Sequence, residues 1–292
     1  MVEIVLIPTQ GFCNRLRAIA CVYILASFLK TRFYINWIPE ECCNCKITDI
    51  LKTSFDIKDL NEIHNTKYLF NPRVHTEQFL QSSEFENLDY LVIQGGHEFK
   101  HPNMLEIDFL KQKHKFYNSL KWVDEINDIV NANSFSNVVG IHFRDYIKQF
   151  DENDGRDFSK NSPLEDFEKH VHHLVHKSNY NFFISSNSDK AYSTLSKIIP
   201  NDRLNILHDI NVSRNCKKGI IHAVANFLIL SKCTFIIGTL FSSYSDEATF
   251  FNMIMKLCIG NEKVTKYHCY GYKEFYKYNT LLPSFQTLHL LT

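Results

Sequence analysis

The sequence has no excess of charge of either sign, with 32 Lys and Arg residues against 32 Asp and Glu residues. A protein that binds nucleic acid or a membrane surface is normally basic, so neither partner is expected. The longest apolar run, GIIHAVANFLIL, is interrupted by His222 and Asn226 and is too short to cross a bilayer. The start lacks the pattern of a signal peptide. We therefore expect a cytoplasmic protein without stable membrane insertion.

A regular cysteine pattern is also missing. The nine cysteines are scattered and odd in number, which argues against a complete disulfide framework. Cys42, Cys43 and Cys45 form a cluster, but no second CxxC or HxxxH motif follows it at zinc-site spacing. The sequence therefore predicts no metal site.

The chain alternates apolar runs of strand length with helical periodicity. The runs EIVLI, RFYINW, LDYLVIQGG, VVGIHF, NFFISS, RLNIL and TFIIG predict strands. Helices are expected over residues 13–30, 118–133, 162–177, 189–199, 217–232 and 242–258, whereas residues 52–88 show no clear pattern. Ser162, as N-cap, and Glu165 would form a capping box at the start of one of these helices.

Such alternation predicts an α/β fold with parallel sheets covered by helices on both faces. The length of 292 residues suits two Rossmann-type halves facing one another across a central cleft. We place the first domain at residues 1–133 and the second at 134–265, with an aromatic tail, 266–292, packing across both.

In sheets of this kind the loops at the carboxyl ends of the strands carry the ligand site. Four such loops read TQGFCNRLR, HFRDY, SSNSD and GTLFSSYS. Hydroxyl side chains that open a helix suit a phosphate, and an arginine fork suits a diphosphate. Alternatively, the serines are helix caps, Arg144 pairs with Asp145 or another carboxylate, and His142 is structural. The hydroxyl residues in these loops include Ser185, Ser186, Thr239, Ser242 and Ser243.

Three motifs in order, GFCNRLRAI, strand-HxR and strand-G-x-x-x-SS-x-x-x-x-A, resemble those of the GDP-fucose-dependent fucosyltransferases. This superfamily includes protein O-fucosyltransferases and the α1,6- and α1,2-fucosyltransferases. The resemblance runs through short motifs over roughly residues 2 to 250. It implies a GT-B-like fold, transfer of fucose from GDP with inversion, no metal cofactor, and a glycan or protein acceptor.

The resemblance also assigns roles. Asn14 would face the reacting sugar and phosphates, Arg144 would bind the β-phosphate, and His142 would help to hold the nucleotide. The turn of Ser242, Ser243 and Tyr244 would complete the diphosphate site. Helix 217–232 would lie against the base, with Asn226 at a position where relatives carry an aspartate.

The departing diphosphate needs positive charge or hydrogen-bond donors, and the sequence has no Asp-x-Asp motif for a metal ion. Arg144 with the Ser242–Ser243 turn is the expected substitute, and Arg214 and Arg15 are possible further phosphate contacts. Candidate general bases are Asp145, Asp151, Glu152 and Asp154, although an acidic loop is more often simply solvated.

Two other functions stay open on the sequence. One is a GT-B glycosyltransferase with another donor, such as GDP-linked rhamnose or a UDP-sugar, because Asn226 departs from the aspartate of the relatives. The other is a protein that binds a nucleotide or glycan without catalysis.

Overall fold

The structure is a computed structural model, and it describes all residues except 1, 71–72, 134–135, 147–157, 208–212 and 261–292. The chain forms two compact units. Unit 1 comprises Met1–Asn127 and Asn211–Val224, and unit 2 comprises Asp128–Ile210 and Ala225–Thr292. Residues 211–224, which lie within the range expected for the second domain, are thus grouped with unit 1. The aromatic tail expected over 266–292 lies outside the described residues.

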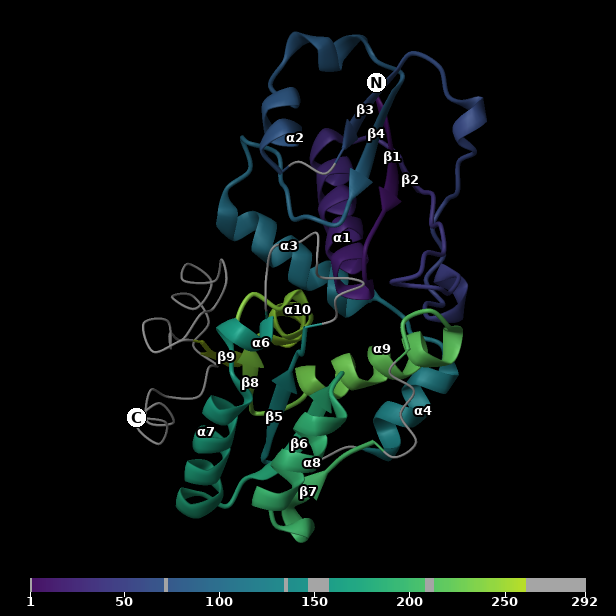
Figure 1. The fold of residues 1–292 in the computed structure, drawn as a ribbon. Helices are drawn as coiled ribbons and strands as arrows, with labels where there is room; N and C mark the ends of the chain where they lie inside the picture. Colours follow the sequence, from purple (N-terminus) through teal and green to yellow (C-terminus); the bar gives the residue numbers. More distant parts are fainter. Residues whose placement is uncertain (1, 71–72, 134–135, 147–157, 208–212, 261–292) are drawn as a thin grey trace. The chain divides into compact units, whose positions relative to one another are not determined.

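Unit 1 is built on a four-stranded parallel sheet (Figure 1). Its strands are β1 (Glu3–Pro8), β2 (Phe33–Ile35), β3 (Thr66–Phe70) and β4 (Tyr90–Gly95), in the order β2-β1-β4-β3. The connecting helices are α1 (Phe12–Leu29), α2 (Arg73–Phe79) and α3 (Glu106–Ser119). Val5 lies opposite both Tyr34 and Val92, so aromatic and β-branched side chains form one face of the sheet.

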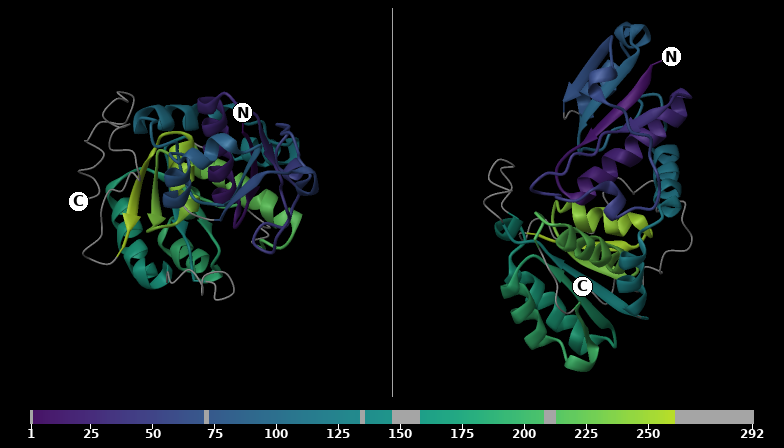
Figure 2. Two further views of the ribbon diagram at one scale, coloured as in Figure 1. Left: turned by 90° about the horizontal axis from the view of Figure 1, so that it is seen from above. Right: turned by 90° about the vertical axis from the view of Figure 1, so that its right-hand side faces the viewer.

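Unit 2 is built on a five-stranded parallel sheet in the order β7-β6-β5-β8-β9 (Figures 1 and 2). The strands are β5 (Val138–Phe143), β6 (Asn181–Ser186), β7 (Leu204–Asn205), β8 (Phe235–Thr239) and β9 (Met255–Ile259). Helices α7 (Leu164–Lys177) and α8 (Asp189–Ile198) cover one face, where Ile141 and Ile237 are fully buried. On the other face, Gly140 leaves room for Leu230 of α9 (Lys217–Ser231).

The remaining elements are short. They are α4 (Asp124–Ala132), α6 (Phe158–Asn161), α10 (Ser243–Phe251) and the 3-10 turns η1 (Ile47–Asp49), η2 (Leu60–Glu62), η3 (Ser83–Asn87) and η5 (Asn201–Arg203). Helices α4 and α9 each contribute residues to both units.

Four sequence predictions about elements were wrong in detail. The helix expected over 118–133 is the end of α3 followed by α4, and β7 has only two residues. The helix expected over 242–258 is α10 followed by β9, because the apolar run MKLCI pairs with β8. Ser162 does not cap α7: its buried hydroxyl donates to the Ile259 carbonyl (2.5 Å) and accepts from the Leu240 amide (3.0 Å).

By length and composition alone, α1 could cross a membrane, and it is the one helix among the described residues with that property. It packs against β1, and 67% of this stretch is buried. Burial of that extent is what the core helix of a folded domain requires.

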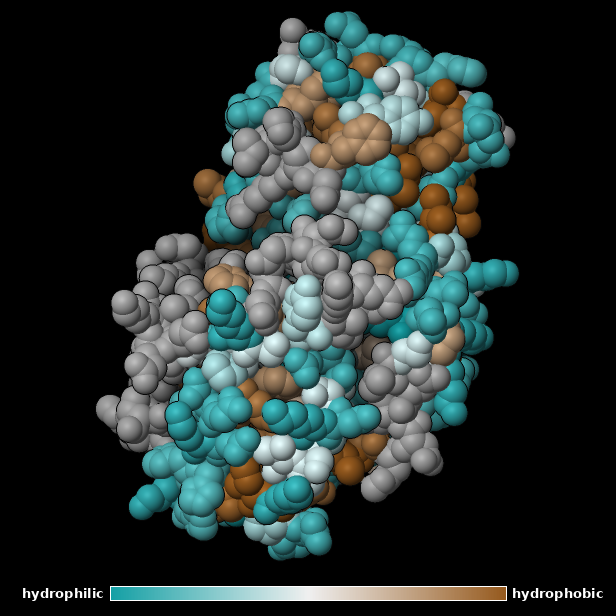
Figure 3. All heavy atoms as spheres, in the orientation of Figure 1, coloured by the Kyte–Doolittle hydropathy of each residue, from teal (hydrophilic) through white to brown (hydrophobic). Residues whose placement is uncertain are grey.

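The surface of unit 1 carries exposed aromatic side chains on its edge strand β3. Tyr68 and Phe70 are 42% and 63% exposed, and their rings stack with centroids 6.1 Å apart. Figure 3 shows apolar residues among hydrophilic ones over this unit. Tyr68 and Phe70 are exposed and Leu69 between them is buried, which follows the two-residue period of a strand.

Candidate functional site

The predicted site residues of unit 2 gather where the order of its sheet reverses. From β5 the chain proceeds through β6 to β7 on one side, whereas β8 and β9 lie on the other side. The carboxyl ends of β5 and β8 are therefore the switch point, the usual ligand position in open α/β sheets. His142, Arg144 and Thr239 all lie there.

Thr239 joins the ends of these two strands. Its hydroxyl donates to the carbonyl oxygen of His142 (3.2 Å) and accepts from the backbone amide of Arg144 (2.8 Å). The guanidinium carbon of Arg144 lies 3.8 Å from the centroid of the Phe158 ring in α6, and the side chain is half-buried. The backbone amide of Arg144 is thus held by Thr239, and its guanidinium packs against the Phe158 ring at the switch point.

Aromatic rings pack around His142, two residues before this arginine. The rings of His142 and Tyr244 are stacked with centroids 4.9 Å apart, and the rings of Phe227 in α9 and Tyr244 form a T-shaped pair with centroids 5.8 Å apart. Asn226, the neighbour of Phe227, is 5% exposed. The structure therefore brings together β5, α9 and α10, the three elements whose residues were predicted to bind the nucleotide.

The amino end of α10 lies beside this stack. Ser242 is the N-cap residue of α10, but its side chain makes no capping bond. Its hydroxyl is buried and has no hydrogen-bond partner among the described residues. Phe241, just before it, has φ 61°, a left-handed conformation that costs a non-glycine residue roughly 1–2 kcal/mol. A buried hydroxyl at a helix amino terminus, where N–H groups of Ser243 and its neighbours point outward, is suited to an anion.

Asp145 is engaged by its own loop and the loop after β6. Its carboxylate accepts hydrogen bonds from the amide of Tyr146 (2.9 Å) and the hydroxyl of Ser188 (3.1 Å). Its backbone amide donates to the side-chain oxygen of Asn187 (2.8 Å). This network ties the ends of β5 and β6 together, so the arrangement around Asp145 is that of a structural carboxylate. Its assignment as a general base stays a prediction.

The serines that end β6 lie one strand away from Arg144. Ser185 pairs with His142 and Ser186 with Phe143 across the sheet. Ser185 is buried, and the hydroxyl of Ser186 accepts from the amide of Ser188 (3.1 Å). The other acidic candidates, Asp151, Glu152 and Asp154, lie outside the described residues.

In unit 1 the first loop is built around Arg15. The prediction that Arg15 contacts a phosphate was wrong. Arg15 is completely buried and donates to the carbonyls of Gln10 (2.8 Å) and Ile38 (2.7 Å) and to the carboxylate of Glu40 (2.8 Å). Gln10 has φ 68°, so Arg15 stabilises a strained turn between β1 and α1. Asn14, in the first turn of α1, is half-buried.

The loop after β4, GGHEF, was missed by the sequence reasoning. A Cβ on Gly96 would lie 2.7 Å from the Cβ of Asn14, so this loop packs directly against the predicted site residue. It also carries His97, which is exposed, and Glu98, which is half-buried and whose carboxylate pairs with buried Lys113. The signal was present, because the glycine pair ends a predicted strand at the same sheet edge as Asn14.

Arg214 lies in the segment that the structure groups with unit 1. Its carbonyl accepts from the backbone amide of Asn44 (3.0 Å), and the Asn44 side chain donates to the carbonyl of Asn215 (2.9 Å). The backbone of Arg214 is thereby hydrogen-bonded to the segment of unit 1 that contains Cys42, Cys43 and Cys45.

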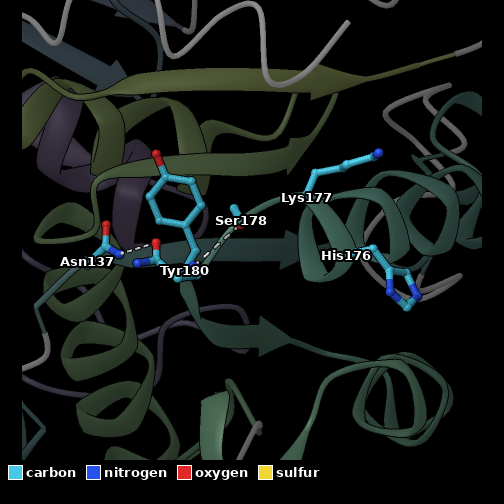
Figure 4. Close-up of a pocket in the computed structure, with 6 residues that line it drawn as sticks. Asn137, His176, Lys177, Ser178 and Tyr180 are labelled. Carbon is cyan, nitrogen blue, oxygen red and sulfur yellow. Dashed lines mark hydrogen bonds between the residues drawn. The ribbon is translucent and has the colours of Figure 1, made fainter.

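Neither of two concavities in the described part of unit 2 is lined by His142, Arg144 or Tyr244. A concavity of about 530 Å³ lies at the amino edge of the unit 2 sheet, with the His176 ring turned away from it (Figure 4). A pocket of about 190 Å³ beside Asp145 and Ser188 is too small for a nucleotide sugar. The larger one is lined by Asn137, His176, Lys177, Ser178, Asn179 and Tyr180.

Within the described residues, no group of three or more His, Cys, Asp or Glu side chains could hold a metal ion.

Comparison with known proteins adds information about the fold. The sequence matches no protein-family model and no curated protein. Among solved structures, the fucosyltransferase NodZ from Bradyrhizobium is 14% identical, with a TM-score of 0.62, covering 88% of this chain and 95% of that one. A variant of FUT1 from Arabidopsis thaliana in complex with GDP is 13% identical, with a TM-score of 0.57 and coverage of 91% and 72%. POFUT1 in complex with GDP is 11% identical, with a TM-score of 0.53 and coverage of 87% and 95%.

At these identities the likeness establishes a shared fold. Two α/β units, each with a parallel sheet, are common to this chain and to these fucosyltransferases. The α/β, GT-B-like fold class predicted from the sequence is confirmed.

Proposed function

We propose, starting from this shared fold, that the protein is a glycosyltransferase that transfers fucose or a related sugar from a GDP-sugar to a hydroxyl group. The observation that carries the proposal is the convergence at the switch point of unit 2. There Arg144, the His142–Tyr244 stack and the amino end of α10 with Ser242 meet at one sheet edge. Solved structures with this fold include NodZ α1,6-fucosyltransferase soaked with GDP-fucose and POFUT1 in complex with GDP.

The proposed chemistry explains why a cation and a helix terminus should meet. When the bond between the sugar carbon and the diphosphate oxygen breaks, negative charge develops on the β-phosphate. The Arg144 guanidinium can donate two parallel hydrogen bonds to phosphate oxygens, and the amino end of α10 supplies N–H donors and a partial positive charge. We assign Ser242, Ser243, Tyr244 and Thr239 to the same diphosphate site.

The acceptor hydroxyl would attack from the face opposite the leaving diphosphate, which inverts the sugar carbon. The hydroxyl proton must pass to a base or to water in that step. We assign Asn14 to the sugar and phosphates, Arg214 to an additional phosphate contact, and Ser185 and Ser186 to the neighbouring donor surface. The acceptor is proposed to be a glycan or a protein.

We propose that the reaction needs no metal cofactor, because Arg144 and the α10 terminus offer the charge that a metal ion would otherwise supply. An activity screen tests this together with the donor. Purified protein is incubated with GDP-fucose, GDP-linked rhamnose and UDP-sugars, with and without EDTA, and released nucleotide is measured. Release of GDP from GDP-fucose that persists in EDTA is the expected result.

Asn226 is the reason for testing several donors. A guanine base presents two N–H donors on one edge, and an asparagine offers one accepting oxygen where a carboxylate would offer two. Calorimetric binding of UDP without binding of GDP would replace GDP by UDP in the proposal. Binding of GDP with no turnover of any donor, with glycan and protein acceptors supplied, would instead indicate a non-catalytic nucleotide-binding protein.

A further inference from the structure

A lysine is completely buried in unit 2, close to the proposed diphosphate site. Lys256 on β9 is 1% exposed and lies opposite Ile236 of β8. Lysine is almost never buried without partners, because its ammonium group loses its hydration. Its position therefore requires specific acceptors for the ammonium group.

The side chain runs alongside β8 toward the carboxyl edge of the sheet. A Cβ on Gly238 would lie 2.7 Å from Cε of Lys256, so the lysine passes over a position that only glycine leaves open. Its Nζ then donates to the carbonyl oxygen of Thr239 (2.9 Å) and to the carboxylate of Asp246 (2.6 Å). Asp246 lies in the first turn of α10, and its side chain is 14% exposed.

These two bonds connect both ends of the turn between β8 and α10. Thr239 is the last residue of β8, and its hydroxyl already bonds the backbone at His142 and Arg144. Lys256 thus holds the same residue by its carbonyl and joins it to the first turn of the helix. Between the two attachment points lie the strained Phe241 and the Ser242 N-cap.

We infer that Lys256 is a positioning residue, which fixes the turn from Thr239 to Asp246 in the geometry that binds the diphosphate of the donor. The inference rests on the proposed function for its ligand. Lys256 acts through the turn because two of its three N–H donors are committed to Thr239 and Asp246 and the residue is buried. Asp246 neutralises the buried charge, so the pair adds order to the turn without adding net charge.

The test variant must lose the link within the turn while unit 2 keeps its folding stability. Lys256→Met alone would leave the Asp246 carboxylate without its cation and would destabilise the unit for that reason. The double variant Lys256→Met/Asp246→Asn removes both charges, so the unit stays folded while the link between Thr239 and α10 is lost. Arg203→Met is the matched control.

Arg203 suits this purpose because it stabilises unit 2 elsewhere. Its guanidinium donates to three backbone carbonyls at the amino edge of the sheet. Its loss therefore weakens the same unit without touching the turn. The three acceptors belong to Val175, Ser178 and Tyr180.

Two readouts are compared at a temperature where all variants are folded. In hydrogen exchange without nucleotide, the amides from Leu240 to Asp246 should exchange about tenfold faster in the double variant and not in Arg203→Met. By calorimetry, the Kd for GDP should rise about tenfold in the double variant and stay within about twofold in the control.

Unchanged exchange in the turn would overturn the inference. So would unchanged GDP affinity in the double variant when the wild-type protein binds GDP. If the turn loosens as expected but the wild-type protein binds no GDP, the proposed function fails while the role of Lys256 in fixing the turn stands.

Discussion

Replacing Arg144 by lysine should slow the proposed transfer by roughly tenfold to 150-fold in kcat/KM. Lysine keeps the positive charge, and it can keep the contact with the Phe158 ring, where the arginine lies 3.8 Å from the centroid. The hydrogen bond from residue 144 to Thr239 also persists, because it involves the backbone amide. What disappears is one of the two parallel hydrogen bonds of the fork, worth about 1.5–3 kcal/mol to a charged acceptor. That free energy corresponds to the stated range of rates.

The assay measures GDP release from GDP-fucose at subsaturating donor, together with thermal melting of each protein. Arg32→Lys is the control, since Arg32 is an exposed arginine in unit 1 between α1 and β2. It should change kcat/KM by less than about twofold, and both variants should melt within about 2 °C of the wild type. If Arg144→Lys retains half or more of the wild-type kcat/KM, the guanidinium does not stabilise the leaving diphosphate, and the reasoning is refuted.

Three further predictions concern stability. Gly140→Ala should destabilise unit 2 by about 1–3 kcal/mol in urea unfolding, because the new Cβ would lie 2.8 Å from the Leu230 side chain. Adding Leu230→Val should recover part of the lost unfolding free energy. If the losses of the two substitutions simply add, this packing is contradicted. Burial, with a contribution from Lys100, lowers the pKa of His101, so the unfolded chain binds the proton more readily. The unfolding free energy should therefore fall as pH drops through about 6.5, less so in His101→Gln, and equal pH slopes would disprove it. Arg15→Met should cost about 2–4 kcal/mol in urea unfolding of unit 1, because two partly buried carbonyls lose the donor that the buried arginine supplies. A loss below about 0.5 kcal/mol would show that water replaces this donor.

The loops of the candidate site could be predicted because each follows a recognisable strand. The runs VVGIHF and TFIIG are apolar enough to be buried strands, and side chains that follow them must appear at one sheet edge. His142, Arg144 and Thr239 were nominated on that basis, and the structure places them at one switch point. The sequence could not show that β5 and β8 are neighbours, since strand order depends on contacts distant in the chain.

Individual side chains were harder to assign than loops. Arg15 and Arg144 both follow a strand, yet Arg15 is completely buried and serves the backbone, whereas Arg144 is half-buried at the sheet edge. Asp145 is similarly engaged by Ser188, which is distant in sequence. Spacing cannot separate such cases, because the partners come from other loops.

The sequence by itself determined the alternation of buried strands and helices, and with it the α/β class and the sheet edge where polar loops gather. These features depend on the spacing of apolar residues within each segment, which does not depend on contacts with distant parts of the chain. Only the tertiary structure decided that residues 211–224 belong with unit 1, and that Lys256 reaches along β8 to Thr239 and Asp246. Such contacts arise from the order of strands and the packing of side chains between distant segments, and no local pattern encodes them.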